Sequence, residues 1–367
     1  MLLSDPLTIT SCTVYRYQID LDPSLPVGKQ RINVRKGLVL DVQLNNRQTA
    51  WAEMAPLSGL DIDSQTITGF SQESLDEVTS QLLQVLPNLI DQPLMMLADL
   101  AEQISLPSLA FPLSLMHAKL THMLPIRIET PQTQSVRVPL VYDGMSTSLL
   151  RRKLLTLGTI NSVKVKVAQT NMASEIQFIY QVLALAPNVS LRLDANRGFS
   201  LEQAIDFLAC LPSHKIEYIE EPCVNPKDNP QIYRQLGVKY ALDESLNSSQ
   251  FDLNLALQQP GLGALIIKPM LLGSLARLQQ MINLAHQDGV RCILSSSLEA
   301  DIGINDLQLV SQALTPDESP GLDTLSAFTQ SLLLATSGLS PRLNHKALQL
   351  LTHIGPPRHA DASGLCS

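Results

Sequence analysis

Apolar and polar residues alternate in three stretches near the N-terminus, at 12–19, 31–42 and 49–54. Alternation with a period of two predicts strands that bury one face. Two prolines and a glycine lie between the first two stretches, so we expect a turn or a mobile loop at 21–30. The chain therefore begins with strands.

A helical pattern follows these strands. Ser74 and Glu77 have the spacing of a capping box, and apolar residues at helical intervals come directly after them. A further helix is predicted over 107–122. Because strands are followed by helices, we predict an α+β unit over residues 1–130.

From residue 136 onward, short apolar stretches alternate with amphipathic ones, which indicates parallel strands connected by helices. Eight such strands suggest a closed barrel over residues 131–325 more than an open sheet. The remaining segment, 326–367, is expected to contain a helix and to end in about a dozen frayed residues. The expected strands lie at 136–142, 162–167, 190–194, 216–220, 239–243, 264–268, 291–296 and, weakly, 321–324.

Three lysines occupy the expected barrel strands. Lys164 and Lys166 alternate with valines, so both lie on one face of their strand. One face of a barrel strand points into the lumen, where an ammonium group is costly unless function requires it. Lys268 ends a later strand. The three lysines are therefore candidates for catalysis.

Three consecutive expected strands, which lie between Lys166 and Lys268 in the sequence, each end with an acidic residue. These residues are Asp194, Glu220 and Asp243. Each lies about one strand–helix unit from the next, so we expect them to converge at the C-terminal mouth of the barrel. Converging carboxylates repel one another and need a cation. Oxygen ligands without Cys or His select a hard divalent ion, Mg²⁺ or alternatively Mn²⁺.

The lysines and the metal together predict one kind of chemistry. A cation stabilises the charge that forms when a proton leaves the carbon next to a carboxylate, so the expected partner is a small-molecule carboxylate. Lys166 would act as the base, and Lys164 would lower its pKa by like-charge repulsion. Lys268 would approach the reacting carbon from the other side.

Residues beside the predicted ligands need their own interpretation. Arg192 shares a strand face with Asp194, so it either supports the metal ligands or forms an unrelated salt bridge. Asn196 follows two residues later and could also support them. Glu221 and Glu244 neighbour predicted ligands, but alternation turns them the other way, and we expect structural roles for both.

Composition narrows the class of protein further. Apolar residues make up 45% of the chain and charged residues 16%, which fits a globular enzyme with a large core. The net charge is −8, and no basic run interleaved with aromatics occurs, which disfavours nucleic acid and anionic membrane as partners. No apolar run reaches the about 18 residues of a membrane span. A basic stretch typical of a secretory signal is missing at the N-terminus, so a cytoplasmic location is expected.

Five short segments together resemble the barrel signature of the enolase superfamily, in its muconate-lactonizing-enzyme-like branch. The resemblance implies a modified barrel of the (β/α)7β type under an N-terminal α+β capping domain, with the C-terminal segment returning to that cap. The known chemistry of this superfamily, which uses lysines and Mg²⁺, agrees with the roles derived above. The segments are Lys164-Val-Lys166, Asp194-Ala-Asn196, Glu220-Glu-Pro222, Asp243-Glu-Ser245 and Lys268-Pro269.

Finer similarity, at Ser295-Ser-Ser-Leu-Glu299 and Pro320-Gly-Leu-Asp-Thr324 among others, implies a carbon–oxygen lyase of menaquinone biosynthesis. It would dehydrate 2-succinyl-6-hydroxy-2,4-cyclohexadiene-1-carboxylate to o-succinylbenzoate. Backbone groups around Ser295, Ser296 and Gly321 would hold the succinyl arm. One departure is the segment 60–68, which resembles an insertion into the cap.

Two other functions remain open at this point. The same metal and lysines permit an N-acylamino acid racemase or a dipeptide epimerase, because a lysine on each side of a carbanion can move a proton in either direction. A barrel with a relic site, recruited for binding or structure, is the non-enzymatic alternative. The intact set of three lysines and three carboxylates argues against it.

Overall fold

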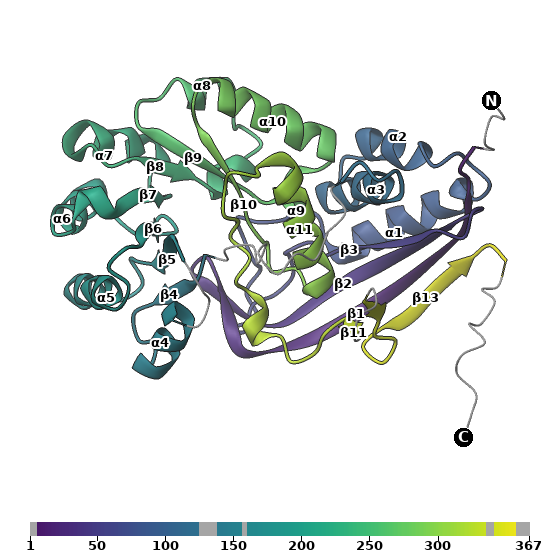
Figure 1. Cartoon of the computed structure of the whole chain (residues 1–367), viewed down its shortest axis with the longest axis horizontal. Coiled ribbons are helices and arrows are strands. Elements are labelled where there is room, and N and C mark those ends of the chain that lie inside the picture. The colour runs from purple at the N-terminus through teal and green to yellow at the C-terminus, as the bar shows by residue number, and fades with distance from the viewer. Residues whose placement is uncertain (1–5, 125–137, 156–159, 335–340, 357–367) are drawn as a thin grey trace.

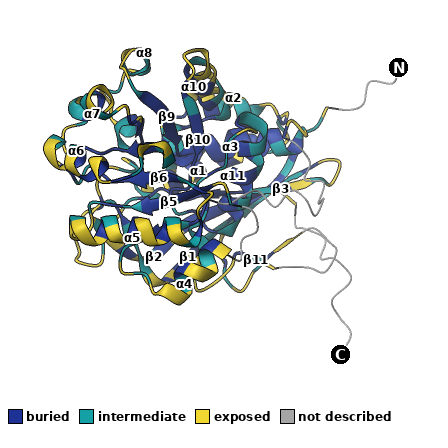
Figure 2. Ribbon diagram, turned by 60° about the vertical axis from the view of Figure 1, so that its left-hand side comes forward, coloured by how far each residue is buried: buried dark blue, intermediate teal, exposed yellow. Residues whose placement is uncertain are grey.

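The structure is a computed structural model that describes residues 6–124, 138–155, 160–334 and 341–356. An antiparallel sheet with three helices covers one side of a curled parallel sheet (Figure 1). We call the first part the cap and the second the barrel. The barrel strands are buried, whereas the outer faces of helices such as α4, α5 and α6 are exposed (Figure 2).

The cap sheet has the strand order β13-β1-β2-β3. Its strands are β1 (Ile9–Val27), β2 (Gln30–Leu44), β3 (Thr49–Met54) and β13 (Gln349–Ile354). The three N-terminal strands predicted from alternation are confirmed. The turn predicted between the first two strands is present after Val27, but no mobile loop spans 21–30, because β1 continues to Val27. A register shift between Asp20 and Leu25 accommodates Pro23, and such irregularities are where strands tolerate proline.

Three helices follow in the cap, and the predicted capping box at Ser74 and Glu77 begins the first of them. The helix predicted over 107–122 is also present, as α3, which contacts both β3 and the barrel helix α9. It thereby joins the two parts of the molecule. The elements are α1 (Leu75–Val85), η1 (Leu86–Leu89), α2 (Met96–Gln103) and α3 (Pro107–Leu120).

The barrel sheet has seven parallel strands among the described residues, in the order β10-β9-β8-β7-β6-β5-β4. They are β4 (Leu140–Tyr142), β5 (Ser162–Lys166), β6 (Ser190–Asp194), β7 (Ile216–Glu220), β8 (Tyr240–Leu242), β9 (Leu262–Ile267) and β10 (Arg291–Leu294). The helices between and after them are α4 (Thr147–Leu155), α5 (Met172–Leu185), α6 (Leu201–Ala209), α7 (Asn229–Leu236), α8 (Leu253–Leu257), α9 (Pro269–Leu272), α10 (Leu275–Gln287) and α11 (Asp301–Leu314). The short 3-10 helices are η2 (Ser213–Lys215), η3 (Pro226–Asp228) and η4 (Glu244–Asn247).

The weakly predicted eighth strand, 321–324, is not a strand. Gly321 forms a single parallel bridge with Ser295 after β10, and the Asp323 carboxylate accepts a hydrogen bond from the Leu140 amide of β4 at 3.1 Å. A loop backbone and one side chain therefore lie where an eighth strand would join β10 to β4.

The helix expected after residue 325 is also wrong for the described residues. Only a 3-10 turn, η5 (Leu325–Ala327), and two short strands, β11 (Leu333–Leu334) and β12 (Arg342–Leu343), precede β13. The Asp301 carboxylate accepts hydrogen bonds from the amides of Leu332 and Leu333, which holds this backbone extended. The frayed end predicted for the last dozen residues lies almost entirely outside the described residues.

Strand β13 pairs with β1, so the segment 349–354 returns to the cap sheet. The boundary expected at residue 130 lies outside the described residues. None of the helices that the structure describes is long and apolar enough to span a membrane.

Candidate active site

The two β5 lysines lie together at the C-terminal end of the barrel. Valines alternate with them and are buried against the surrounding helices, which turns Lys164 and Lys166 to the opposite face. Lys164 Nζ lies 2.5 Å from Glu220 Oε2 and 2.8 Å from Asp194 Oδ2. Lys166 Nζ lies 2.8 Å from the same Asp194 oxygen.

The strand register explains this convergence. Lys166 pairs with Asp194 across β5 and β6, and Asp194 pairs with Glu220 across β6 and β7. Lys268, at the end of β9, lies 2.5 and 2.7 Å from the two oxygens of Asp243. The structure therefore gathers the sequence-predicted lysines and carboxylates into two ion-paired groups on neighbouring strand ends.

The carboxylates do not form the ready-made metal cluster that the sequence suggested. Among the described residues, no three Asp, Glu, His or Cys side chains converge closely enough to hold an ion. The ammonium group of Lys164 stands between Asp194 and Glu220, and that of Lys268 is bound to Asp243. The lysine ammonium groups therefore lie next to the same carboxylates that would bind a metal cation.

Burial and neighbouring charges set the ionisation of this group. Burial tends to raise the pKa of Asp194, but Lys164 and Lys166 outweigh it and hold that pKa well below its usual range. Burial raises the pKa of Glu220; Lys164 lowers it in part, while repulsion from Asp194 and Asp243 raises it further. Burial is the largest cause of this net rise, and the repulsion adds to it. All-oxygen donors of this kind suit a hard divalent cation.

Lys164 does not stand beside Lys166 as an unpaired charge, as the sequence-based interpretation assumed. Burial lowers the pKa of Lys164, but the ion pairs with Asp194 and Glu220 dominate and raise it well above its usual value. Lys164 would act on Lys166 by like-charge repulsion only if another cation were bound to Asp194 and Glu220.

Asn196 connects Lys166 to Glu244, a residue that the sequence analysis had considered structural. Its Oδ1 accepts a hydrogen bond from Lys166 Nζ at 2.6 Å, and its Nδ2 donates to Glu244 Oε1 at 2.7 Å. Glu244 was expected to point away from the site. Strand β8 ends at Leu242 and Glu244 lies in η4, so strand alternation no longer sets its direction. Burial and Asp243 raise the pKa of Glu244 to about 7.

Two other neighbours have structural partners. Arg192 donates to Glu217 Oε2 at 2.9 Å and to the Ser319 carbonyl at 2.8 Å, one inward-facing layer below the carboxylates. The salt-bridge alternative therefore holds, and support of the metal ligands by Arg192 is wrong. Glu221 accepts hydrogen bonds from the Asp243 and Ser245 amides at 3.0 and 2.8 Å, as expected of a structural residue.

The backbone groups predicted to hold a substrate arm are already paired. The Ser295 amide donates to the Ile267 carbonyl, the Ser296 amide to Gly321, and the Gly321 amide to Leu294. These three N–H groups are therefore not free to donate to a substrate, and the backbone role predicted for them needs correction. The Ser295 and Ser296 hydroxyls remain near the C-terminal end of β10, where any contact with substrate stays a prediction.

The cap contributes a residue that strand-end reasoning missed. The Phe70 ring centroid lies 5.3 Å from Lys268 Nζ, which is within cation–π distance. Phe70 belongs to the loop between β3 and α1, so no local pattern placed it over the barrel.

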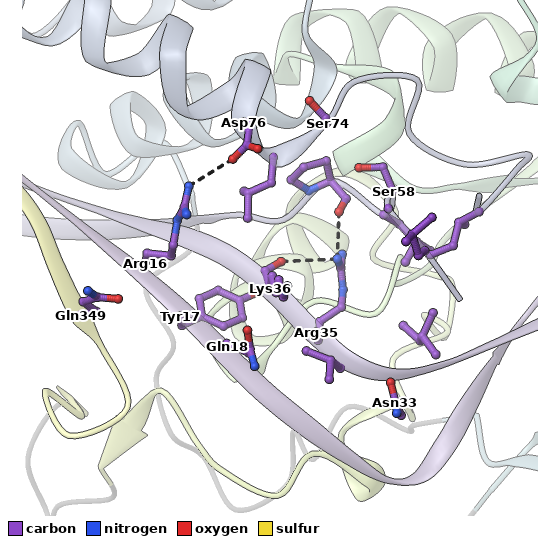
Figure 3. A pocket seen from close by; sticks show the side chains of 18 of the residues that line it. Arg16, Tyr17, Gln18, Asn33, Arg35, Lys36, Ser58, Ser74, Asp76 and Gln349 are labelled. Carbon is purple, nitrogen blue, oxygen red and sulfur yellow. Dashed lines mark hydrogen bonds and ion pairs between the residues drawn. The ribbon is translucent and has the colours of Figure 1, made fainter. Parts of the chain in front are cut away.

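A cavity of about 960 Å³ lies within the cap and not at the barrel mouth. Strands β1 and β2, the segment 56–60 and residues 346–349 line it. Figure 3 shows Arg16 reaching Asp76 across this cavity, and Arg35 directed at backbone carbonyls of its wall. None of the candidate lysines or carboxylates lines it.

Comparison with known proteins identifies the class first. Residues 149–340 match the family described as "Enolase C-terminal domain-like", and residues 9–120 match "MenC, N-terminal domain". Among solved structures, a dipeptide epimerase from Enterococcus faecalis V583, complexed with Mg and the dipeptide L-Leu-L-Tyr, has the same fold. Its TM-score is 0.72 at 18% identity, covering 95% of this chain and 98% of the epimerase chain. Fold and site thus define an enolase-superfamily enzyme.

Curated relatives narrow the family. The o-succinylbenzoate synthase of Yersinia enterocolitica is 32% identical over 319 residues, covering 86% of this chain and 90% of the relative. That of Klebsiella pneumoniae is 32% identical over 345 residues, covering 92% and 98%. The chain belongs to the o-succinylbenzoate synthase family of the enolase superfamily.

Proposed function

We propose that this chain is a carbon–oxygen lyase that dehydrates 2-succinyl-6-hydroxy-2,4-cyclohexadiene-1-carboxylate to o-succinylbenzoate in menaquinone biosynthesis. Similarity to o-succinylbenzoate synthases, at 32% identity over 86% and 92% of this chain, supports the reaction. The observation that carries it is the ion-paired group at the barrel rim, with Lys166 on β5 and Lys268 on β9. With this function we propose a cytoplasmic enzyme that takes a free small-molecule carboxylate and needs neither nucleic acid nor membrane.

Lys166 is proposed as the base. In neutral form its Nζ would take the proton from the carbon next to the ring carboxylate. The same Nζ would then return that proton to the departing hydroxyl, so that water leaves and the ring becomes aromatic. Asp194 and Asn196 fix Nζ on two sides, which restricts the direction from which it meets the substrate.

Asp194, Glu220 and Asp243 are proposed to hold Mg²⁺, with Mn²⁺ as a substitute. Bound there, the cation would offset the negative charge that develops on the substrate carboxylate as the proton leaves. The all-oxygen donor set supports this assignment, and so does the repulsion between Glu220 and its neighbours Asp194 and Asp243, which a bound cation would relieve. Lys268 would stabilise the same developing charge from β9, beneath Phe70.

An assay with two substrate classes tests the proposal. Purified protein with Mg²⁺ would be incubated with the cyclohexadiene carboxylate, and separately with N-succinyl amino acids and dipeptides. We expect o-succinylbenzoate to form, because the chain covers at least nine-tenths of the synthases that it matches. The dipeptide epimerase shares only the fold, at 18% identity. Turnover restricted to amino acid or dipeptide substrates would contradict the proposal and favour the racemase or epimerase alternative.

A further inference from the structure

A single arginine of the cap binds both the cap and the barrel. Arg35 lies on β2 with 3% of its surface exposed. On the cap side, Nη1 donates to the Pro56 carbonyl at 2.8 Å and Nη2 to Ala55 at 2.6 Å. On the barrel side, Nε donates to the Leu298 carbonyl at 2.8 Å and Nη2 to Ser297 at 3.2 Å. The planar guanidinium therefore fixes two backbone segments relative to each other.

The barrel segment that Arg35 holds is strained. Leu298 has a φ of 64°, which is unfavourable for a residue with a side chain. Its carbonyl is bound by Arg35, and its amide donates to Ser296 Oγ at 2.8 Å. Its side chain packs with apolar cap residues, among them Leu57 and Ile67. Such a conformation persists only where the surroundings determine it, and here the cap supplies much of that determination.

A buried carboxylate of the cap holds the next part of the same segment. Glu53, on β3, accepts hydrogen bonds from the Ala300 and Gly303 amides, both at 2.8 Å. Tyr17 of β1 donates to it at 2.5 Å. These partners show that Glu53 joins β3 to the start of α11.

We propose that Arg35 is a positioning residue that couples the cap to the barrel segment 297–303, and through it shapes the substrate pocket. This inference rests on the proposed function. On the cap side, Ala55 and Pro56 begin the loop that carries Phe70 to Lys268. On the barrel side, Ser297 and Leu298 directly follow the two serines at the end of β10. The loop that carries Phe70 and the loop after β10 therefore both begin at carbonyls that Arg35 binds.

Arg35→Lys tests the coupling, because lysine keeps the charge but has no planar fork with which to span both segments. The matched control is Arg16→Lys, a cap arginine that pairs with Asp76 and makes no contact with the barrel among its described partners. We would measure KM and kcat for the cyclohexadiene carboxylate, affinity for o-succinylbenzoate, and amide hydrogen exchange across 297–303.

For Arg35→Lys we expect KM and the product dissociation constant to rise about tenfold, because two or more hydrogen bonds from a charged donor are lost. We expect kcat to change less than threefold, since Lys166 and its partners lie on β5 and β6. Exchange across 297–303 should accelerate about tenfold, and Arg16→Lys should leave all values unchanged. A merely stabilising contact would lower Tm without moving KM or product affinity well below Tm, and that result would overturn the proposal.

A measurement on the wild-type protein covers the case in which Arg35→Lys does not fold. Saturation with o-succinylbenzoate should slow amide exchange at 55–70 and at 297–303 together, because the Arg35 side chain binds both segments. Protection of only one of these segments would overturn the coupling. A wild type that binds the product but does not dehydrate the cyclohexadiene would instead contradict the proposed function, so the two failures are distinguishable.

Discussion

Lys166 is the side chain on which the proposed chemistry depends most directly. Its ammonium group has two fixed acceptors, and 15% of its side chain is exposed. Lys166→Ala removes the only proposed proton acceptor, so we expect kcat to fall by about a thousandfold or more. Steady-state kinetics with the cyclohexadiene carboxylate would measure this. Affinity for the product should change little, and retention of more than a tenth of wild-type kcat would exclude Lys166 as the base.

Asn196 is expected to act through Lys166 and not on the substrate. Asn196→Ala leaves Lys166 with Asp194 as its remaining described acceptor and removes the donor to Glu244. We expect kcat to fall about 10- to 100-fold, the usual range for a residue that orients a functional group, with KM nearly unchanged. Asn196→Asp should restore part of kcat, because an acceptor for Lys166 is kept. A loss confined to KM would contradict the positioning role.

Individual elements show where local sequence pattern is informative and where it is not. The strand ends carrying Asp194, Glu220 and Asp243 were predictable, because alternation fixes the face and one strand–helix unit fixes the spacing. Glu244 was misread, since the strand ends before it. The extension of β1 past Pro23 and the extended C-terminal segment were missed as well. Both depend on contacts with distant residues, which propensity does not encode.

The junction between β3 and α11 should make folding stability depend on pH. Burial raises the pKa of Glu53 to about 7, although its hydrogen bonds from Tyr17, Ala300 and Gly303 oppose the rise. The folded state therefore holds a proton that the unfolded state releases near pH 4.5. The contribution of Glu53 is complete below that pH and is lost as pH rises through about 7.

Glu53→Gln would measure that contribution. From the shift, we expect the wild type to lose up to about 3 kcal/mol of unfolding free energy from Glu53 between these pH values. Urea unfolding of both proteins at several pH values gives the difference. The stability of wild type relative to Glu53→Gln should fall between pH 5 and pH 8. A difference that stays flat would show that Glu53 is ionised at its ordinary pKa.

At the scale of the whole molecule, the site is made by the meeting of two parts. The barrel supplies the lysines and carboxylates, and the cap supplies Phe70 and, through Arg35, the arrangement of the loop after β10. The sequence revealed the barrel half because each residue ends a strand. It could not reveal the cap half, because Arg35 and Leu298 are 263 positions apart and no pattern in the sequence indicates that they meet.

The whole molecule should also respond to the divalent cation. Exhaustive treatment with EDTA is expected to abolish turnover, and Mg²⁺ should restore it, because the cation is proposed to offset the negative charge that develops on the substrate carboxylate. Since Asp194, Glu220 and Asp243 lie at neighbouring strand ends only in the folded chain, Mg²⁺ bound by them at about 100 times its dissociation constant should add about 2.7 kcal/mol of stability. Calorimetry with and without Mg²⁺ would show this as a rise in Tm. Asp194→Asn removes one ligand charge and should reduce that rise, whereas Arg16→Lys should keep it. Full activity after chelation would show that the carboxylates serve the lysines alone.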